Sequence, residues 1–209
     1  FTEALATGDD IKSLLHFVPV QSGELYTIPP RTIHALGAGV CVLEPQIVQP
    51  GKRPLSLRLH DWNRRYDKAG NLCEHGSPRP LHIEKALQYV DFSALRGEAL
   101  AAQCRTRPHV VYHQHSLTVA EMAPMPCLHS YIFSGTGAHF IDALGELASV
   151  ILLEGNARIV VDGEPFDLTR GESGALAASA KSIDIQCCRA LLAISYCIPE
   201  LYTAARAIE

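Results

Sequence analysis

One histidine stands in a context that would aim its side chain at a metal ion. His34 follows a β-prone run, Leu25–Ile28, that stops at the pair Pro29-Pro30. The prolines fix φ, and Gly23 before the run permits unusual dihedrals, so the turn is stiff. A stiff strand-turn-strand orients an imidazole before a metal arrives. We therefore consider His34 a candidate metal ligand; the alternative is a buried ring satisfied by backbone groups.

A carboxylate and an arginine follow at positions that could serve the same chemistry. The apolar run Val40–Glu44 predicts a strand inside a barrel or sandwich, ending in the carboxylate of Glu44. Residues 56–62 alternate in type, which predicts a strand with Arg58 and His60 on one face and leucines on the other. Such a strand lines a polar cavity or forms an edge with its polar face in water, and the pattern allows both.

Length and composition are those of an ordinary globular protein. The 209 residues are 47% hydrophobic and 19% charged, which is enough to bury a core. A net charge of −4 gives no electrostatic footprint for nucleic acid or an anionic membrane. The seven cysteines include no CxxC pair, which argues against a disulfide framework or a thiolate zinc site. Reduced thiols favour a cytoplasmic location.

The predicted elements divide the chain into three parts. Residues 1–18 are predicted to be helical, and residues 19–105 hold the motifs above, a long polar loop and a short helix at 81–90. Residues 106–209 are almost entirely β, with Asp162-Gly163 predicting a hairpin and a turn expected at 154–156. Many short strands at this spacing predict a sandwich or jelly roll. The predicted strands are residues 110–112, 117–119, 130–133, 149–153, 158–161, 182–185 and 191–196.

The histidine motif resembles the second sequence motif of the cupin superfamily, Gly-(Asp/Glu)-x4-Pro-x-Gly-x2-His. Its spacing is kept from Gly23 to His34, but Arg31 stands where glycine is usual. Residues 171–182 repeat the motif in degenerate form, with Ser182 in place of the histidine, so we expect that copy to be structural. The resemblance implies a mainly β cupin jelly-roll fold of two sandwich or barrel units, the first incomplete, with short helices.

Four stretches, in this order, look like motifs of type I phosphomannose isomerases, and the β-rich remainder is similar to that family's carboxy-terminal cupin. The chain therefore resembles the carboxy-terminal portion of such an enzyme. The resemblance implies a zinc-dependent aldose-ketose isomerase that interconverts mannose 6-phosphate and fructose 6-phosphate by enediol proton transfer. The stretches are residues 28–37, 42–46, 57–64 and 79–87.

The resemblance also implies roles for individual residues. The family's zinc is held by a Gln-x-His pair, a Glu and one later His, and the later His corresponds to His34. The other ligands would lie upstream, so we expect a missing amino-terminal segment from the same gene product, as an opening on Phe1 also indicates. The arginine over the reacting carbons corresponds to Arg58. The family has an Asp four residues before it, where this chain has Pro54.

Further charged residues are candidates for the sugar phosphate, although the pattern favours a solvated surface charge for each of them. Glu44 would be a partner of a metal ligand, a carboxylate base or a member of a structural salt bridge. A different class remains open: a non-catalytic cupin that binds a sugar or regulates a partner, consistent with the missing ligands and Pro54. One imidazole alone cannot hold zinc tightly. The phosphate candidates are Lys52, Arg53, Arg64 and Arg79.

Overall fold

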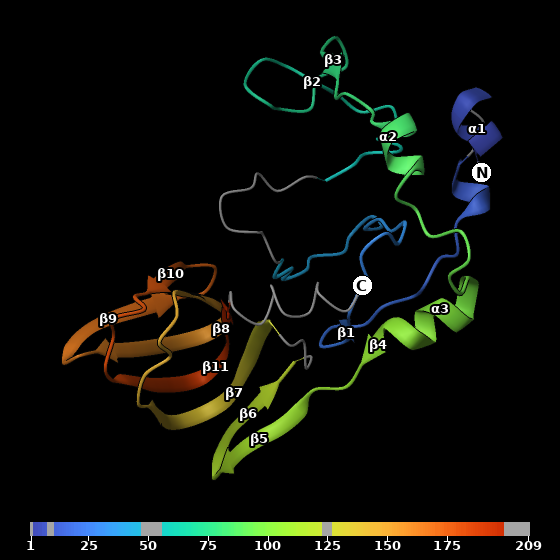
Figure 1. Cartoon of the computed structure of the whole chain (residues 1–209). Coiled ribbons are helices and arrows are strands. Elements are labelled where there is room, and N and C mark those ends of the chain that lie inside the picture. Colours follow the sequence, from blue (N-terminus) through green and yellow to red (C-terminus); the bar gives the residue numbers. More distant parts are fainter. Residues whose placement is uncertain (1, 8–10, 47–55, 123–126, 199–209) are drawn as a thin grey trace. The chain divides into compact units, whose positions relative to one another are not determined.

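The structure, a computed structural model, describes residues 2–7, 11–46, 56–122 and 127–198 (Figure 1). It forms two compact units, and each is described by itself. The first unit holds the described residues up to Arg105 except residues 42–46. The second unit holds those residues and everything described from Thr106 onward.

The first unit consists mostly of irregular chain connecting short elements. Its helices are short, and its strands are two residues long, pairing as β1 with β4 and as β2 with β3. A helix was predicted at 81–90, and α2 confirms it in shortened form. The elements are α1 (Thr2–Thr7), the 3-10 helix η1 (Ile11–Leu14), β1 (Leu25–Tyr26), β2 (Arg65–Tyr66), β3 (Ser77–Pro78), α2 (Ile83–Leu87), α3 (Gly97–Cys104) and β4 (Arg105–Thr106).

Two strands predicted early in the chain are wrong. Residues 40–44 and 56–62 have strand-like sequences but adopt no strand. A strand is stable only when its backbone groups pair with a neighbour, and sequence alternation alone supplies no neighbour. Val40 and Val42, expected inside a barrel, are 36% and 46% exposed. The first motif keeps only the two residues of β1.

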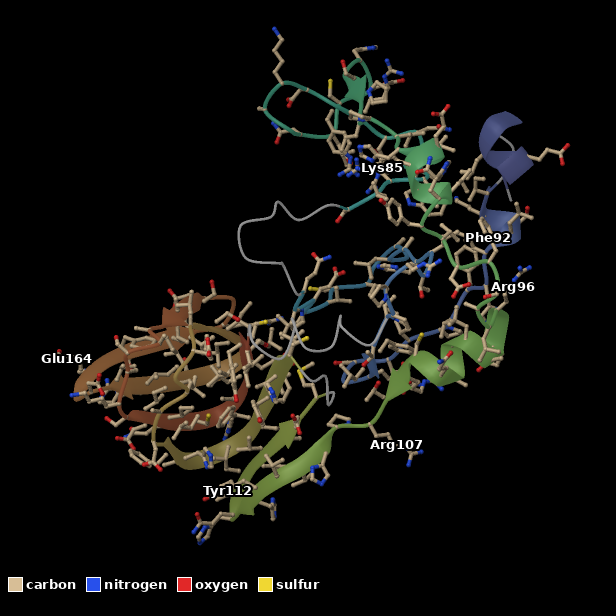
Figure 2. All side chains as sticks on the ribbon, viewed as in Figure 1. Lys85, Phe92, Arg96, Arg107, Tyr112 and Glu164 are labelled. Atoms are coloured by element: carbon tan, nitrogen blue, oxygen red, sulfur yellow. The ribbon has the colours of Figure 1, made fainter. Side chains whose placement is uncertain are left out.

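The second unit is one antiparallel sheet in the order β10-β8-β11-β7-β6-β5, with β9 also paired to β8. Figure 1 shows its long strands curving, and Figure 2 labels Glu164 where β9 begins. The fold class is mainly β, as the sequence predicted. The strands are β5 (His109–Gln114), β6 (Ser116–Glu121), β7 (Leu128–Ile141), β8 (Ala148–Val161), β9 (Glu164–Thr169), β10 (Ser173–Leu176) and β11 (Ile183–Cys197).

The core of the second unit is formed by alternating apolar residues of the long strands. Phe133, Leu152, Ile159 and Leu192 are each at most 2% exposed and belong to one buried cluster. Burying a side chain of this size stabilises the fold by about 1.5–3 kcal/mol. Alternate residues of these strands therefore face the core, as the period of two in the sequence predicted.

The turn expected at 154–156 is wrong, because β8 runs through it. Gly155 has φ of +73°, and a Cβ there would lie 2.2 Å from the carbonyl oxygen of Arg189. β11 shifts register opposite this point, after Cys188. Glycine thus marks a bulge inside one long strand rather than a turn between two. The Asp162-Gly163 hairpin is confirmed, with φ of +50° and +89° joining β8 to β9.

The degenerate copy of the motif folds as a strand, a turn and a strand. Its residues run through β10 and the turn after it to the start of β11. Ser182, at the position of the histidine, donates its backbone N–H to Asp162 Oδ1 at 2.9 Å. Among the described residues, none of the helices combines the length and apolar character that crossing a membrane requires.

Candidate functional site

His34 is exposed, and its ring contacts the backbone of its own turn. The Nδ1 atom lies 2.9 Å from the carbonyl oxygen of Thr32, which leaves Nε2 directed elsewhere. A histidine that donates through Nδ1 to a carbonyl presents Nε2 as a lone-pair donor, the arrangement common among metal-binding histidines. The contact with Thr32 fixes the ring through a backbone group, but the ring is not buried as the alternative interpretation required.

Arg31 explains why glycine is usual at its position in this motif. Its φ is +69°, in the left-handed region that favours glycine. The side chain compensates by donating its Nε–H to the carbonyl oxygen of Tyr89 at 2.7 Å. The backbone of Asp91 donates to Arg31 O at 3.3 Å, so the motif turn is tied to the segment after α2.

A buried carboxylate gathers three arginines in the first unit. Of the charged side chains that the structure describes, Asp61 alone is buried, with 6% exposed. Its Oδ1 accepts from Arg64 Nη2 at 2.6 Å and from Arg79 Nη2 at 2.5 Å. Its Oδ2 accepts from Arg79 Nε at 2.9 Å, and Arg58 Nε lies 4.0 Å from Oδ1. We call Asp61, Arg58, Arg64 and Arg79 the arginine cluster.

A tight turn brings the cluster together. Arg64 N donates to Asp61 O at 3.0 Å, and the two residues between them, Trp62 and Asn63, both have φ of +55°. Two positive φ angles define a type I′ turn, for which asparagine is suited and tryptophan is not. The Trp62 ring packs edge-on to His60 with ring centroids 5.0 Å apart, which holds it in this unusual conformation.

The same segment anchors Arg58 through its backbone. Arg58 N donates to His82 Nδ1 at 3.1 Å, and His82 N donates back to Arg58 O at 2.7 Å. Arg58 Nη1 donates to Pro80 O at 3.3 Å. The residues before α2 therefore hold Arg58, and Figure 2 labels Lys85 on that helix.

The charges in the cluster reinforce one another. Hydrogen bonds from Arg79 and Arg64 lower the pKa of Asp61 to about 2, although burial opposes the shift. Asp61 in turn raises the pKa of Arg79 above its usual value. The guanidinium of Arg79 also lies over the ring of Tyr66, 4.8 Å from its centroid. Asp61 is thus ionised at neutral pH and fixes Arg79 from one side.

The structure brings three of the predicted site residues together: Arg58, Arg64 and Arg79. His34 makes its hydrogen bond with Thr32 and not with a member of the cluster. Glu44 is exposed and belongs to the second unit. Lys52, Arg53 and Pro54 lie outside the described residues.

Asp61 is the residue that sequence reasoning missed. The predicted strand placed it on the leucine face, away from Arg58, whereas in the structure its Oδ1 lies 4.0 Å from Arg58 Nε. The available signal was the Asp-x-Asn-Arg pattern, because asparagine before the last position favours positive φ and returns the fourth residue to the first. This aspartate also stands near Arg58, whereas the family's aspartate position is occupied by Pro54.

The described residues do not by themselves fit a zinc site. Within the part of the chain that the structure describes, no group of three or more His, Cys, Asp and Glu side chains is placed to hold a metal. Protein zinc sites normally use three or four such ligands. His34 therefore supplies at most one ligand, and the others would come from residues outside the described ranges.

Two solved structures align with part of the chain at low identity. The mannose 6-phosphate isomerase of Bacillus subtilis aligns over 67% of this chain and 40% of its own, with 19% identity and a TM-score of 0.49. A cupin 2 conserved barrel domain protein from Leptotrichia buccalis aligns over 43% of this chain and 44% of its own, with 22% identity and a TM-score of 0.37. No family model matches the chain.

Two sequence relatives of the chain are named as mannose-6-phosphate isomerases. A mannose-6-phosphate isomerase of Streptococcus mutans is 29% identical over 180 residues, which are 86% of this chain and 50% of the relative. Mannose-6-phosphate isomerase ManA of Bacillus subtilis is 21% identical over 161 residues, 76% of this chain and 44% of the relative. The resemblance to the carboxy-terminal portion of mannose-6-phosphate isomerases is thus confirmed. The chain spans about half the length of these curated relatives.

Proposed function

We propose that this chain is part of a mannose-6-phosphate isomerase that interconverts mannose 6-phosphate and fructose 6-phosphate. The observation that carries the proposal is the similarity to the Streptococcus mutans isomerase over 86% of the chain. The arginine cluster supports it, because it gathers cationic side chains suited to a phosphorylated substrate. The reduced cysteines expected from the sequence fit a cytoplasmic enzyme.

Arg58 is proposed to stabilise the charge that develops during proton transfer. In aldose-ketose interconversion, a proton leaves the carbon beside the carbonyl and returns to the neighbouring carbon through a cis-enediol. Negative charge accumulates on the substrate oxygens as the first proton leaves. A guanidinium stays cationic throughout and, held in place beforehand, stabilises that charge. The Arg58 side chain is 27% exposed and donates to Pro80 O, while its backbone N–H donates to His82, so the residue is both fixed and accessible.

Arg64 and Arg79 are proposed to bind the phosphate group. Each binds Asp61 with Nε and Nη2, through its carboxylate or its backbone carbonyl, so Nη1 faces elsewhere. Their side chains are 44% and 39% exposed, which leaves them within reach of a ligand. A forked guanidinium recognises phosphate with good geometry. Lys52 and Arg53 remain candidates for the same role.

Zinc is proposed as the cofactor, with His34 as one ligand through Nε2. Zinc held there would supply a Lewis acid. Because the described residues do not complete such a site, the remaining ligands would come from an amino-terminal segment of the same gene product. For Glu44 we retain two proposed roles: partner of a metal ligand, or carboxylate base.

The test is an isomerase assay with mannose 6-phosphate, together with zinc analysis, on the full-length protein and its His34→Ala variant. We expect wild-type activity with stoichiometric zinc, and loss of both in the variant, since removing a direct ligand weakens a zinc site. His75→Ala, which removes an imidazole elsewhere in the first unit, is the control and should keep both. Full activity and zinc content in His34→Ala would contradict the metal assignment; an inactive wild type would contradict the function.

A second candidate is a module that binds a sugar phosphate without converting it. The observation that favours it is the arginine cluster itself, whose contacts are complete without a metal. Calorimetric binding of mannose 6-phosphate by a full-length protein that shows no turnover, with or without added zinc, would favour this candidate over the isomerase.

A further inference from the structure

Burying the carboxylate of Asp61 costs free energy, so other interactions must compensate for it. A buried carboxylate loses its hydration, and only good hydrogen bonds compensate for that loss. Asp61 uses both carboxylate oxygens on guanidinium groups, and its backbone oxygen accepts from Arg64 Nε at 3.3 Å. Two arginines are thus fixed by one residue, while Arg58 approaches the same oxygen at 4.0 Å.

The charges of the cluster do not cancel. Three guanidinium charges against one carboxylate charge leave two positive charges, on side chains that are 27%, 44% and 39% exposed. Like charges this close repel each other unless an anion lies between them. Asp61 is that anion, and the excess charge equals the charge of a phosphate monoester dianion.

The backbone around Asp61 is also held in an uncommon form. Trp62 has φ of +55°, which is rare for a bulky residue and persists only where the surroundings impose it. The turn through Trp62 and Asn63 places Arg64 back over Asp61, and Lys12 Nζ lies over the Trp62 ring, 5.5 Å from its centroid. The strained backbone at Trp62 indicates that the contacts around the arginine cluster hold it in one geometry.

We propose that Asp61 is a positioning residue whose buried carboxylate holds Arg64 and Arg79 as a preorganised site for a doubly charged phosphate group, with the charge of Arg58 beside it. It touches no substrate itself. Its effect is to fix the direction of the Arg64 and Arg79 guanidiniums, so that binding a phosphate requires little further ordering. The identity of the phosphate-bearing ligand rests on the proposed function.

Position and charge make opposite predictions for one substitution. Asp61→Asn is nearly isosteric and removes one negative charge, so the cluster would carry three positive charges. If only charge mattered, the variant would bind phosphate more tightly. If Asp61 acts by positioning, the guanidiniums separate and binding weakens. The direction of the change therefore decides between the two roles.

The experiment measures inorganic phosphate binding by calorimetry, and kcat and KM for mannose 6-phosphate, in the full-length protein. For Asp61→Asn we expect the phosphate Kd and the KM to rise at least about tenfold, with a smaller change in kcat, as loss of uniform binding requires. Asp61→Glu keeps the charge and should recover part of the loss. Unchanged or tighter phosphate binding in Asp61→Asn would overturn the proposal.

Two further outcomes separate this inference from the proposed function. Phosphate binding that depends on Asp61 in a protein without isomerase activity upholds the inference and contradicts the function. Isomerase activity that is insensitive to Asp61→Asn upholds the proposed function and contradicts this inference. Should Asp61→Asn fail to fold, Arg79→Lys replaces it, because this half-exposed side chain keeps its charge but loses the forked contact. The same rise in Kd is expected, and an unchanged Kd overturns the proposal.

Discussion

The two units of this chain are stabilised in different ways. In the second unit, strands of up to fifteen residues pair with one another and enclose a continuous apolar core. In the first unit, the buried apolar side chains are few, and large ones such as Phe17 and Leu36 are 63% and 56% exposed. What orders the first unit around Arg58 is a set of hydrogen bonds and ion pairs centred on Asp61.

The difference shows how strand-like sequences depend on neighbours. The run Val40–Glu44 is as apolar and β-prone as the strands of the second unit, yet it pairs with no strand among the described residues. In the second unit, β8 and β11 provide the pairing and the core together. A period of two predicts which face of a strand is apolar, but the presence of a partner decides whether the strand forms.

The largest expected effect is at the bulge of the second unit. Gly155→Ala would place a Cβ 2.2 Å from Arg189 O, in addition to the strain of its positive φ. Backbone atoms cannot move aside cheaply, so we expect a loss of about 3–5 kcal/mol in unfolding free energy. Urea unfolding followed by far-UV circular dichroism measures it.

Gly163→Ala is the matched control for that substitution. Gly163 also has positive φ, at +89°, but no heavy atom lies within 4 Å of its Cβ position. It should lose only about 1–2 kcal/mol, from conformational strain alone. Equal losses in the two variants would show that the close approach in β8 is unimportant, and that the second unit does not rely on strand pairing at this point.

Acid should act on the first unit through Asp61. Because the folded-state pKa of Asp61 is depressed to about 2, its contribution is present above its unfolded pKa and is lost as pH falls through the folded value. The contribution is at most about 2.5 kcal/mol. Trp62, the one tryptophan of the chain, adjoins Asp61 and reports on this region by fluorescence.

We expect the Trp62 fluorescence to change as pH falls from about 4 to about 2, within the window set by the two pKa values. In Asp61→Asn that acid transition should be absent. A transition that persists unchanged in the variant would mean that another group controls acid sensitivity, and that the carboxylate does not order the first unit.

A smaller effect is expected at Arg31. Arg31→Ala and Arg31→Gly both remove the hydrogen bond to Tyr89, but only alanine keeps the strain of φ at +69°. The glycine variant should therefore be more stable than the alanine variant by about 1 kcal/mol. Urea unfolding followed by Trp62 fluorescence measures the difference. Equal stabilities would indicate that the left-handed conformation at this position is absent in solution.

The sequence predicted the fold best where side chains repeat along long strands. Each strand predicted in the second unit overlaps an observed strand, and the Asp162-Gly163 hairpin is confirmed. The bulge at Gly155 was interpreted as a turn because glycine marks both, and the two strands predicted at 182–185 and 191–196 are the single strand β11. The strand β9 was not predicted. In the candidate site, the motif spacing selected Arg58, Arg64 and Arg79, which the structure brings together. It could not select Asp61, because that residue's role comes from a turn that inverts the face assigned by strand alternation.

The most direct measurement is kcat/KM for mannose 6-phosphate in the Arg58→Ala variant of the full-length protein. Arg158→Ala is the control, since it removes an arginine that is 55% exposed and pairs with Asp167 in the second unit. We predict a fall of at least about a hundredfold for Arg58→Ala, the scale of losing a fixed electrostatic donor. The control should stay within about twofold, since exposed ion pairs contribute little. Wild-type kcat/KM in Arg58→Ala would contradict the account.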